Sequence, residues 1–143
     1  MKLSILTATY NREKYLQRLY DSIMQNLQTS KLEIEWIIID DGSADSTKNR
    51  INELEHNALE QPNNIKNRIQ IKYIYQQNLG KMAAINKGVN EAIGELIIDC
   101  DSDDFFAENA FNIIERNASK LLQKEKLYAL CFLKKDFDNN ISR

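Results

Sequence analysis

The chain has 143 residues, of which 43% are hydrophobic and 28% charged, with 19 basic residues against 21 acidic ones. This length suits one compact domain with its own core, and we expect residues 1–143 to form a single domain. The near balance of charge argues against a nucleic-acid partner. Apolar runs of about five or six residues are far shorter than the roughly 20 that a membrane helix needs. With no recognisable signal peptide, we expect a cytoplasmic protein, with the inner face of the membrane as an alternative location.

Short apolar runs alternate with amphipathic stretches, which predicts alternating strands and helices. The expected strands are Leu3–Ala8, Ile34–Ile39, Ile69–Tyr75, Glu95–Asp99 and Leu127–Leu133. Apolar residues at helical spacing predict helices over Arg12–Leu27, from near Ser46 through Ala58, over Met82–Ala92 with Gly94 as the C-cap, and over Phe111–Leu122. The stretch Glu60–Arg68 holds the only proline and is expected to be a loop.

Strands and helices in this order predict an α/β fold, with a mainly parallel sheet and helices on both faces. The strands IEWIII and ELIID are nearly all apolar, as expected where both faces of a sheet are covered. Ligands of such sheets bind beyond the carboxyl ends of the strands. The candidate site is therefore formed by the loops Thr7–Arg12, Asp40–Ser43, Gln76–Lys81 and Asp101–Asp104.

The last of these loops is acidic and reads DCDSDD over Asp99–Asp104. Carboxylates this close repel one another unless a positive charge lies among them. One aspartate could cap the helix after Phe105 and the others could simply be solvated. Four acids at the end of an apolar strand instead favour a divalent cation such as Mg²⁺ or Mn²⁺, which prefers carboxylate oxygens.

Two other loops carry groups that suit a nucleotide. The carboxylates of Asp40 and Asp41 follow a buried strand and can accept hydrogen bonds from a ribose hydroxyl or a base N–H. Gly80 and Lys81 open a predicted helix, whose N-terminus favours an anion such as a diphosphate. A turn glycine beside a surface lysine is the alternative interpretation. The loop is not a P-loop, because Lys81 is followed by Met82.

Taken together, four motifs resemble the amino-terminal half of the family 2 glycosyltransferases, which have the GT-A (Rossmann-like) fold. They are TATYNR at Thr7–Arg12, DDGSADST at Asp40–Thr47, NLGK at Asn78–Lys81 and DSDD at Asp101–Asp104. The resemblance runs from Leu3 to Phe106 and covers most of the chain. It implies a nucleotide-sugar-binding portion that is truncated relative to a full catalytic domain.

The resemblance also implies a donor, a cofactor and their ligands. The expected donor is a nucleotide-diphosphate sugar, most simply a UDP-sugar, and the expected cofactor is Mn²⁺ or Mg²⁺. The residues implied for the nucleotide sugar are Thr7, Thr9, Tyr10, Asn11, Asp40, Asp41, Gly80, Lys81, Asp101 and Ser102. Those implied for the metal are Asp103, Asp101 and Asp104. The sugar would pass, with inversion, to a hydroxyl of a glycan or a lipid-linked acceptor.

The catalytic base is not identified in the sequence. Members of the family use a carboxylate well past the D-x-D loop, and residues 105–143 offer no convincing candidate. We therefore expect the donor-binding part of a longer enzyme or a truncated relative. A non-catalytic nucleotide-sugar-binding remnant is one alternative. Another is a phosphatase of the haloacid dehalogenase type, whose D-x-D-x-T loop resembles Ile98–Ser102, with Asp99 as nucleophile and Asp101 as acid/base. A homo-oligomer is also left open.

Overall fold

The computed structural model describes residues 1–121, 134–135 and 141–142, so the strand predicted over Leu127–Leu133 lies outside the described residues. The strands are β1 (Lys2–Thr9), β2 (Glu33–Asp40), β3 (Ile69–Tyr75), β4 (Leu96–Asp99), β5 (Lys134–Lys135) and β6 (Ile141–Ser142). The helices are α1 (Glu13–Thr29), α2 (Thr47–Leu59), α3 (Asn63–Lys66), α4 (Lys81–Glu91) and α5 (Ala110–Leu121). None of the helices in these residues is long and apolar enough to cross a membrane.

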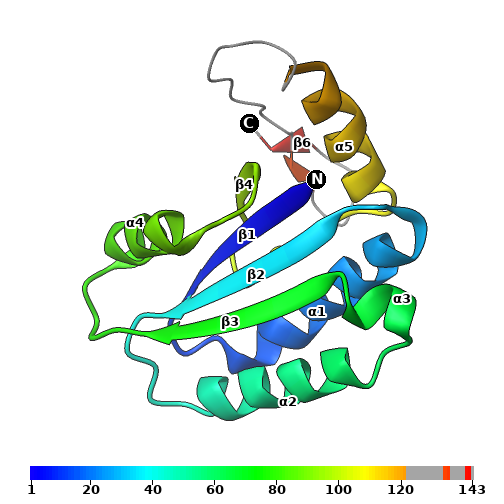
Figure 1. Ribbon diagram of the computed structural model, residues 1–143. Coiled ribbons are helices and arrows are strands. Elements are labelled where there is room, and N and C mark those ends of the chain that lie inside the picture. Colours follow the sequence, from blue (N-terminus) through cyan, green and yellow to red (C-terminus); the bar gives the residue numbers. More distant parts are fainter. Residues whose placement is uncertain (122–133, 136–140, 143) are drawn as a thin grey trace.

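Four of the strands form a parallel sheet in the order β3-β2-β1-β4 (Figure 1). β1 lies between β2 and β4, pairing Thr9 with Asp40 on one side and Leu6 with Asp99 on the other. The carboxyl ends of three strands therefore meet at one edge of the sheet. β5 and β6 form a separate antiparallel pair. The α/β architecture with a parallel sheet, predicted from the sequence, is confirmed.

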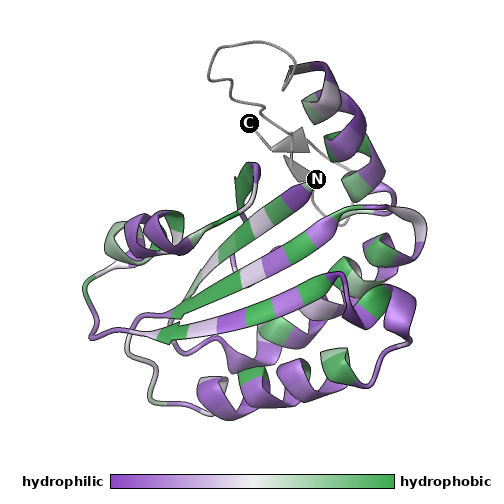
Figure 2. Ribbon diagram, in the orientation of Figure 1, coloured by the Kyte–Doolittle hydropathy of each residue, from purple (hydrophilic) through white to green (hydrophobic). Residues whose placement is uncertain are grey.

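Helices cover both faces of this sheet. α1 and α2 pack on one face, over a core that includes the fully buried Trp36. α4 packs on the other face, against Leu6, Ile37 and Ile39. Figure 2 shows the resulting pattern, with apolar residues banded along the strands and polar residues over much of α2. Alternate residues of β2 thus pack into the two cores on opposite faces of the sheet, which explains why this strand is almost entirely apolar.

Two local predictions were wrong. The stretch expected to be a loop contains α3, which begins after Pro62 and buries Ile65; proline fixes a backbone angle that suits the start of a helix. α4 ends with Ala92 as its C-cap, so Gly94 does not close the helix. The N–H of Gly94 instead donates to Ser4 Oγ at 2.9 Å, and a Cβ on Gly94 would lie only 2.7 Å from that oxygen.

A buried carboxylate ties the segment before β4 to the sheet. Glu35 Oε2 accepts hydrogen bonds from Ser4 Oγ at 2.6 Å and from the N–H of Ile93 at 3.0 Å, and the residue is 3% exposed. We expect Glu35→Ala to lower the free energy of unfolding by about 2–4 kcal/mol, because it leaves buried donors unpaired beside a cavity. Glu35→Gln keeps an acceptor oxygen and should cost less than about 1 kcal/mol. Urea unfolding at pH 7 checks both, and equal losses would contradict the role given to the acceptor.

Candidate functional site

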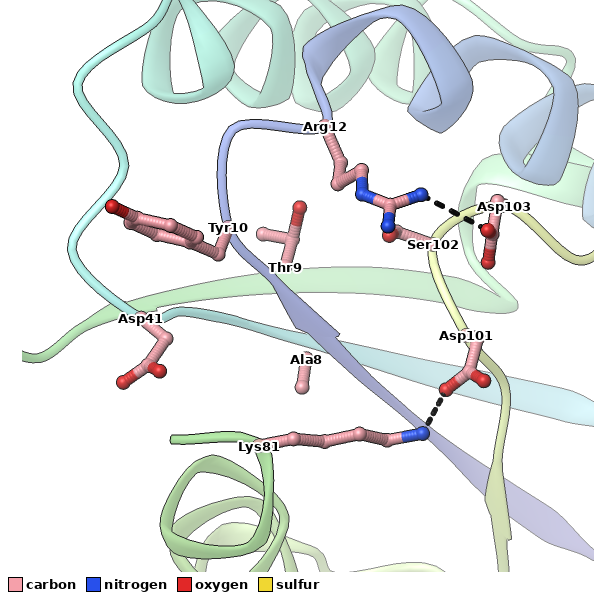
Figure 3. A pocket seen from close by; sticks show the side chains of 9 residues that line it. All are labelled: Ala8, Thr9, Tyr10, Arg12, Asp41, Lys81, Asp101, Ser102 and Asp103. Atoms are coloured by element: carbon pink, nitrogen blue, oxygen red, sulfur yellow. Dashed lines mark hydrogen bonds and ion pairs between the residues drawn. The ribbon is translucent and has the colours of Figure 1, made fainter. Parts of the chain in front are cut away.

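A pocket of about 320 Å³ opens where β1, β2 and β4 end (Figure 3). The side chains that line it come from Ala8, Thr9, Tyr10, Arg12, Asp41, Lys81, Asp101, Ser102 and Asp103. The nucleotide-sugar residues predicted from the sequence that line this pocket are Thr9, Tyr10, Asp41, Lys81, Asp101 and Ser102. Of the predicted metal ligands, Asp101 and Asp103 line it. The structure thus brings together residues from four segments that are far apart in the sequence, one after each strand of the parallel sheet.

Thr7 and Asp40 are buried and do not line the pocket. Thr7 Oγ1 accepts a hydrogen bond from the indole N–H of Trp36 at 3.0 Å. The Asp40 carboxylate accepts hydrogen bonds from the N–H of Ser43 at 2.8 Å and from the Tyr73 hydroxyl at 2.9 Å. Burial, together with this hydrogen bond and the charge of Asp40, raises the pKa of Tyr73. Both predicted residues therefore serve contacts within the fold.

Asn11 joins two of the loops that surround the pocket without lining it. Its side-chain oxygen accepts hydrogen bonds from the N–H groups of Ala44 at 2.8 Å and Asp45 at 3.3 Å. Its own N–H donates to Ser43 Oγ at 2.9 Å. The φ angle of 52° at Asn11 is in the left-handed region, which asparagine adopts more readily than most residues. Asn11 therefore supports the loop that carries Tyr10.

The carboxylate of Asp41 accepts three hydrogen bonds. Its Oδ1 accepts hydrogen bonds from Gln76 Nε2 at 2.7 Å and from the N–H of Leu79 at 2.9 Å, and its Oδ2 accepts one from the N–H of Gly80 at 2.9 Å. Burial alone would raise the pKa of Asp41, but these hydrogen bonds outweigh it and lower the pKa below its usual value. Asp41 is thus an ionised acceptor, and it fixes the loop that leads into α4.

This arrangement also explains the placement of Gly80, which was predicted as a binding residue. Gly80 is the N-cap of α4, with a φ of 91° and a ψ of 159°, a conformation open essentially only to glycine. It does not line the pocket. Its role is to let the chain turn so that Lys81, the first residue of α4, reaches the cavity.

Two cationic side chains meet the acids that line the pocket. Lys81 Nζ forms an ion pair with Asp101 and lies 4.0 Å from Asp99 Oδ2. Arg12 Nη1 lies 3.0 Å from Asp103 Oδ2. Both pairs are drawn in Figure 3. Arg12 was not among the binding residues predicted from the sequence, although it belongs to the TATYNR motif. A basic residue between a strand and a helix is expected to be solvent-exposed unless a contact with an acidic residue is known.

The donor chemistry of the pocket suits a hard divalent cation. Among the described residues, no three His, Cys, Asp or Glu side chains gather as a ready-made metal cluster. Asp101 and Asp103 nevertheless offer two carboxylates to one cavity, which suffices for Mg²⁺ when water and substrate phosphates complete the shell. Asp104 does not line the cavity; its N–H donates to the Asp101 carbonyl at 3.0 Å.

Thr9 is a further sign that a polar group belongs in this cavity. The residue is 2% exposed and lines the pocket, and its Oγ1 is buried without a hydrogen-bond partner in the described part of the chain. Most buried polar atoms in folded proteins are paired. Thr9 therefore fits a ligand that brings its own polar atoms.

The rim of the site depends on an ionised Asp45. Its Oδ2 accepts a hydrogen bond from the N–H of Glu13 at 3.2 Å and its Oδ1 accepts one from the N–H of Thr47 at 3.0 Å, so it links the starts of α1 and α2. Burial alone would raise the pKa of Asp45, but the hydrogen bonds outweigh it and lower the pKa. The carboxylate therefore stabilises the fold above its unfolded-state pKa, and this stabilisation is lost as the pH falls through the lower folded-state value.

We expect Asp45→Asn to lower the free energy of unfolding by about 1 kcal/mol at pH 7, as for the loss of a helix cap. In acid the wild type protonates Asp45 and loses the stabilisation that the carboxylate provides. The difference in free energy of unfolding between the two proteins should therefore become smaller below about pH 4. Urea unfolding of both proteins from pH 7 down to pH 3 measures this gap. A gap that stays constant over that range would contradict the role given to the charge.

Comparison with known proteins agrees with these features. The model of the family described as Glycosyl transferase family 2 matches residues 4–136. An uncharacterized glycosyltransferase, MG060 of Mycoplasma genitalium, is 34% identical over 92% of this chain. The undecaprenyl-phosphate 4-deoxy-4-formamido-L-arabinose transferase of Proteus mirabilis is 32% identical over 71% of this chain. The chain spans 41% and 29% of the lengths of these two relatives.

Solved structures of GT-A glycosyltransferases share the fold. S. aureus TarS 1-349 in complex with UDP superposes with a TM-score of 0.62 at 26% identity, over 82% of this chain and 31% of that one. The mannosyltransferase PcManGT of Pyrobaculum calidifontis, in complex with GDP-Man and Mn²⁺, has a TM-score of 0.63 at 18% identity, over 86% of this chain and 32% of that one. The four motifs, the parallel sheet and the family match agree: this chain belongs to glycosyl transferase family 2.

Proposed function

We propose that this chain is the donor-binding part of an inverting, metal-dependent glycosyltransferase, which transfers a sugar from a nucleotide-diphosphate sugar to a glycan or a lipid-linked acceptor. The observation that carries the proposal is the pocket itself, in which an ionised Asp41, the cation Lys81 and the acid pair Asp101 and Asp103 surround one cavity. Membership of the family supports the reaction class. The Proteus relative, named as an undecaprenyl-phosphate transferase, supports a lipid-linked acceptor.

The two ends of the cavity suit the two ends of such a donor. Asp41 is an ionised acceptor and would take a hydrogen bond from an N–H of the base, such as that of uracil. Tyr10 is 49% exposed and presents its ring at the pocket, where a base can stack on it. Lys81 begins α4, so its ammonium group and the helix N-terminus would both attract the diphosphate.

Asp101 and Asp103 would hold Mn²⁺ or Mg²⁺. When bound, the cation neutralises the negative charge that grows on the nucleoside diphosphate leaving group. In an inverting transfer, the acceptor oxygen forms a bond to the anomeric carbon as the bond to the diphosphate oxygen breaks. The acceptor proton passes to a base, and we assign no residue of this chain to that role.

The phosphatase alternative is not retained. Its aspartate loop belongs on the first strand of its fold, whereas the motif Ile98–Ser102 begins within β4, an edge strand of the described sheet that comes fourth in the chain, and the family match points elsewhere. The single domain, the cytoplasmic location and the homo-oligomer stay predictions.

Calorimetric titration with UDP, GDP and dTDP, each with and without Mn²⁺, tests the proposal. One nucleotide should bind, and it should bind more tightly with Mn²⁺ than without it. The matching nucleoside monophosphate is the control and should gain less from the metal, because it lacks the second phosphate that shares the cation. Binding of none of the three diphosphates would refute the proposal. Binding without sugar transfer to any acceptor would favour the non-catalytic remnant.

A further inference from the structure

Each of the two acids that would hold the metal forms an ion pair with a different cationic side chain. Asp103 faces the guanidinium of Arg12 at 3.0 Å, and Asp101 faces the ammonium of Lys81. All four side chains line the same pocket (Figure 3). A divalent cation that takes the two carboxylates must therefore compete with two side chains already in contact with them.

Both pairs are open to water, so they can be exchanged at little cost. The side chains of Arg12 and Asp103 are each 47% exposed, and those of Lys81 and Asp101 are 52% and 36% exposed. Ion pairs this exposed shift an equilibrium constant by no more than about fivefold. A metal bound by two carboxylates and a diphosphate can displace them.

We propose that Arg12 and Lys81 exchange partners when the donor and its metal bind. In the structure, the two side chains form ion pairs with Asp103 and Asp101. When a divalent cation takes these carboxylates, the guanidinium and the ammonium are released to the diphosphate in the same cavity. This inference rests on the proposed function, and it adds Arg12 to the residues that bind the donor.

Charge balance supports the exchange. In the pocket, Arg12 and Lys81 set two positive charges against Asp103 and Asp101, beside the ionised Asp41. The metal and the diphosphate of a nucleotide sugar add two positive and two negative charges, so their binding leaves the net charge of the pocket unchanged and does not require Arg12 and Lys81 to leave the cavity. Released cations that contact the diphosphate would stabilise it, because hydrogen bonds between ionised groups are stronger than those between neutral groups.

Lys14 offers a matched control for Arg12. Its Nζ lies 4.8 Å from the centre of the Tyr15 ring, and the guanidinium carbon of Arg12 lies 5.5 Å from the same ring. The two residues therefore carry the same charge in the same neighbourhood. Lys14, however, does not line the pocket.

The first measurement is Mn²⁺ binding without nucleotide, followed by the electron paramagnetic resonance signal of free Mn²⁺ at fixed pH and ionic strength. Arg12→Gln should bind Mn²⁺ about two- to fivefold more tightly than the wild type, because the competing cation is gone. Lys14→Gln should change the affinity by less than about 1.5-fold, because salt screens a charge that does not touch the carboxylates. Lys81→Gln should behave like Arg12→Gln.

The second measurement is UDP binding at saturating Mn²⁺. Here Arg12→Gln and Lys81→Gln should weaken binding by about three- to tenfold, through loss of a charge-assisted contact to the diphosphate, whereas Lys14→Gln should not. The opposite signs of the two effects are the signature of partner exchange, which a merely structural role would not produce.

Mn²⁺ affinity in Arg12→Gln that equals or falls below that of Lys14→Gln would overturn the inference, as would Mn²⁺ binding by none of these proteins. Tighter Mn²⁺ binding by Arg12→Gln with no nucleotide bound by any protein would have a different meaning. It would show that Arg12 competes with the metal, and it would refute the proposed donor instead.

Discussion

Replacing Asp103 with asparagine should abolish the metal dependence of nucleotide binding, with UDP affinity in Mn²⁺ falling by at least about tenfold. Asparagine preserves the size of the side chain but removes the charge, and a neutral amide is a poor ligand for a hard divalent cation. Asp103 lines the pocket, so we expect the substitution to remove a metal ligand without disturbing the fold. Calorimetric titration of UDP with and without Mn²⁺ measures the effect.

Asp104 provides the control, since it differs from Asp103 by one position in the same acidic loop. It does not line the pocket, and its backbone N–H donates to the Asp101 carbonyl. Asp104→Asn should therefore leave the metal dependence in place, with UDP affinity within about twofold of the wild type. Equal losses in both variants would mean that the loop acts through its total charge, and a metal effect that survives Asp103→Asn would remove Asp103 from the site.

The sequence predicted the sheet because its strands are short, apolar and separated by helical patterns of the right length. It also predicted the edge where the site lies, because parallel strands bring their carboxyl ends together. That rule places the loops that carry Thr9, Asp41 and Asp101 at this edge. The family resemblance then gave these residues their implied roles, and the family itself is confirmed.

Sequence could not decide between neighbouring acids. Consecutive side chains of a strand point to opposite faces of the sheet. We therefore expect only one of Asp40 and Asp41 to face the pocket, and the sequence pattern does not decide which one does. The structure distinguishes the two acids by their hydrogen-bond donors. Asp40 accepts a hydrogen bond from Tyr73 in β3, and Asp41 accepts hydrogen bonds from the loop before α4.

The sequence pattern also gave no sign that Arg12 belongs to the site. Its relevance comes from Asp103, which lies 91 residues away in the chain, so no local pattern reports the contact. The same holds for Gly94, whose approach to Ser4 in β1 decides its role. Contacts between distant segments set these details, whereas local periodicity sets the elements.

Replacing Asp41 with asparagine should weaken both the fold and the site. The Asp41 carboxylate accepts hydrogen bonds at both oxygens, and two of its donors are the backbone N–H groups of Leu79 and Gly80. An amide has only one acceptor oxygen, so either orientation sets its NH₂ group against a backbone N–H that cannot turn away. We expect a loss of about 1–3 kcal/mol in the free energy of unfolding. UDP affinity should fall by at least about tenfold, because the start of α4 and Lys81 lose their anchor.

Asp40→Asn isolates this effect, because it makes the same chemical change one residue earlier. Asp40 accepts hydrogen bonds from the N–H of Ser43 and from the Tyr73 hydroxyl. A hydroxyl can donate or accept, so the amide oxygen can serve Ser43 while the NH₂ group donates to the Tyr73 oxygen. Stability should then fall by less than about 1 kcal/mol, with UDP affinity nearly unchanged. Nucleotide binding that fails in Asp40→Asn and survives in Asp41→Asn would reverse the assignment of the two acids.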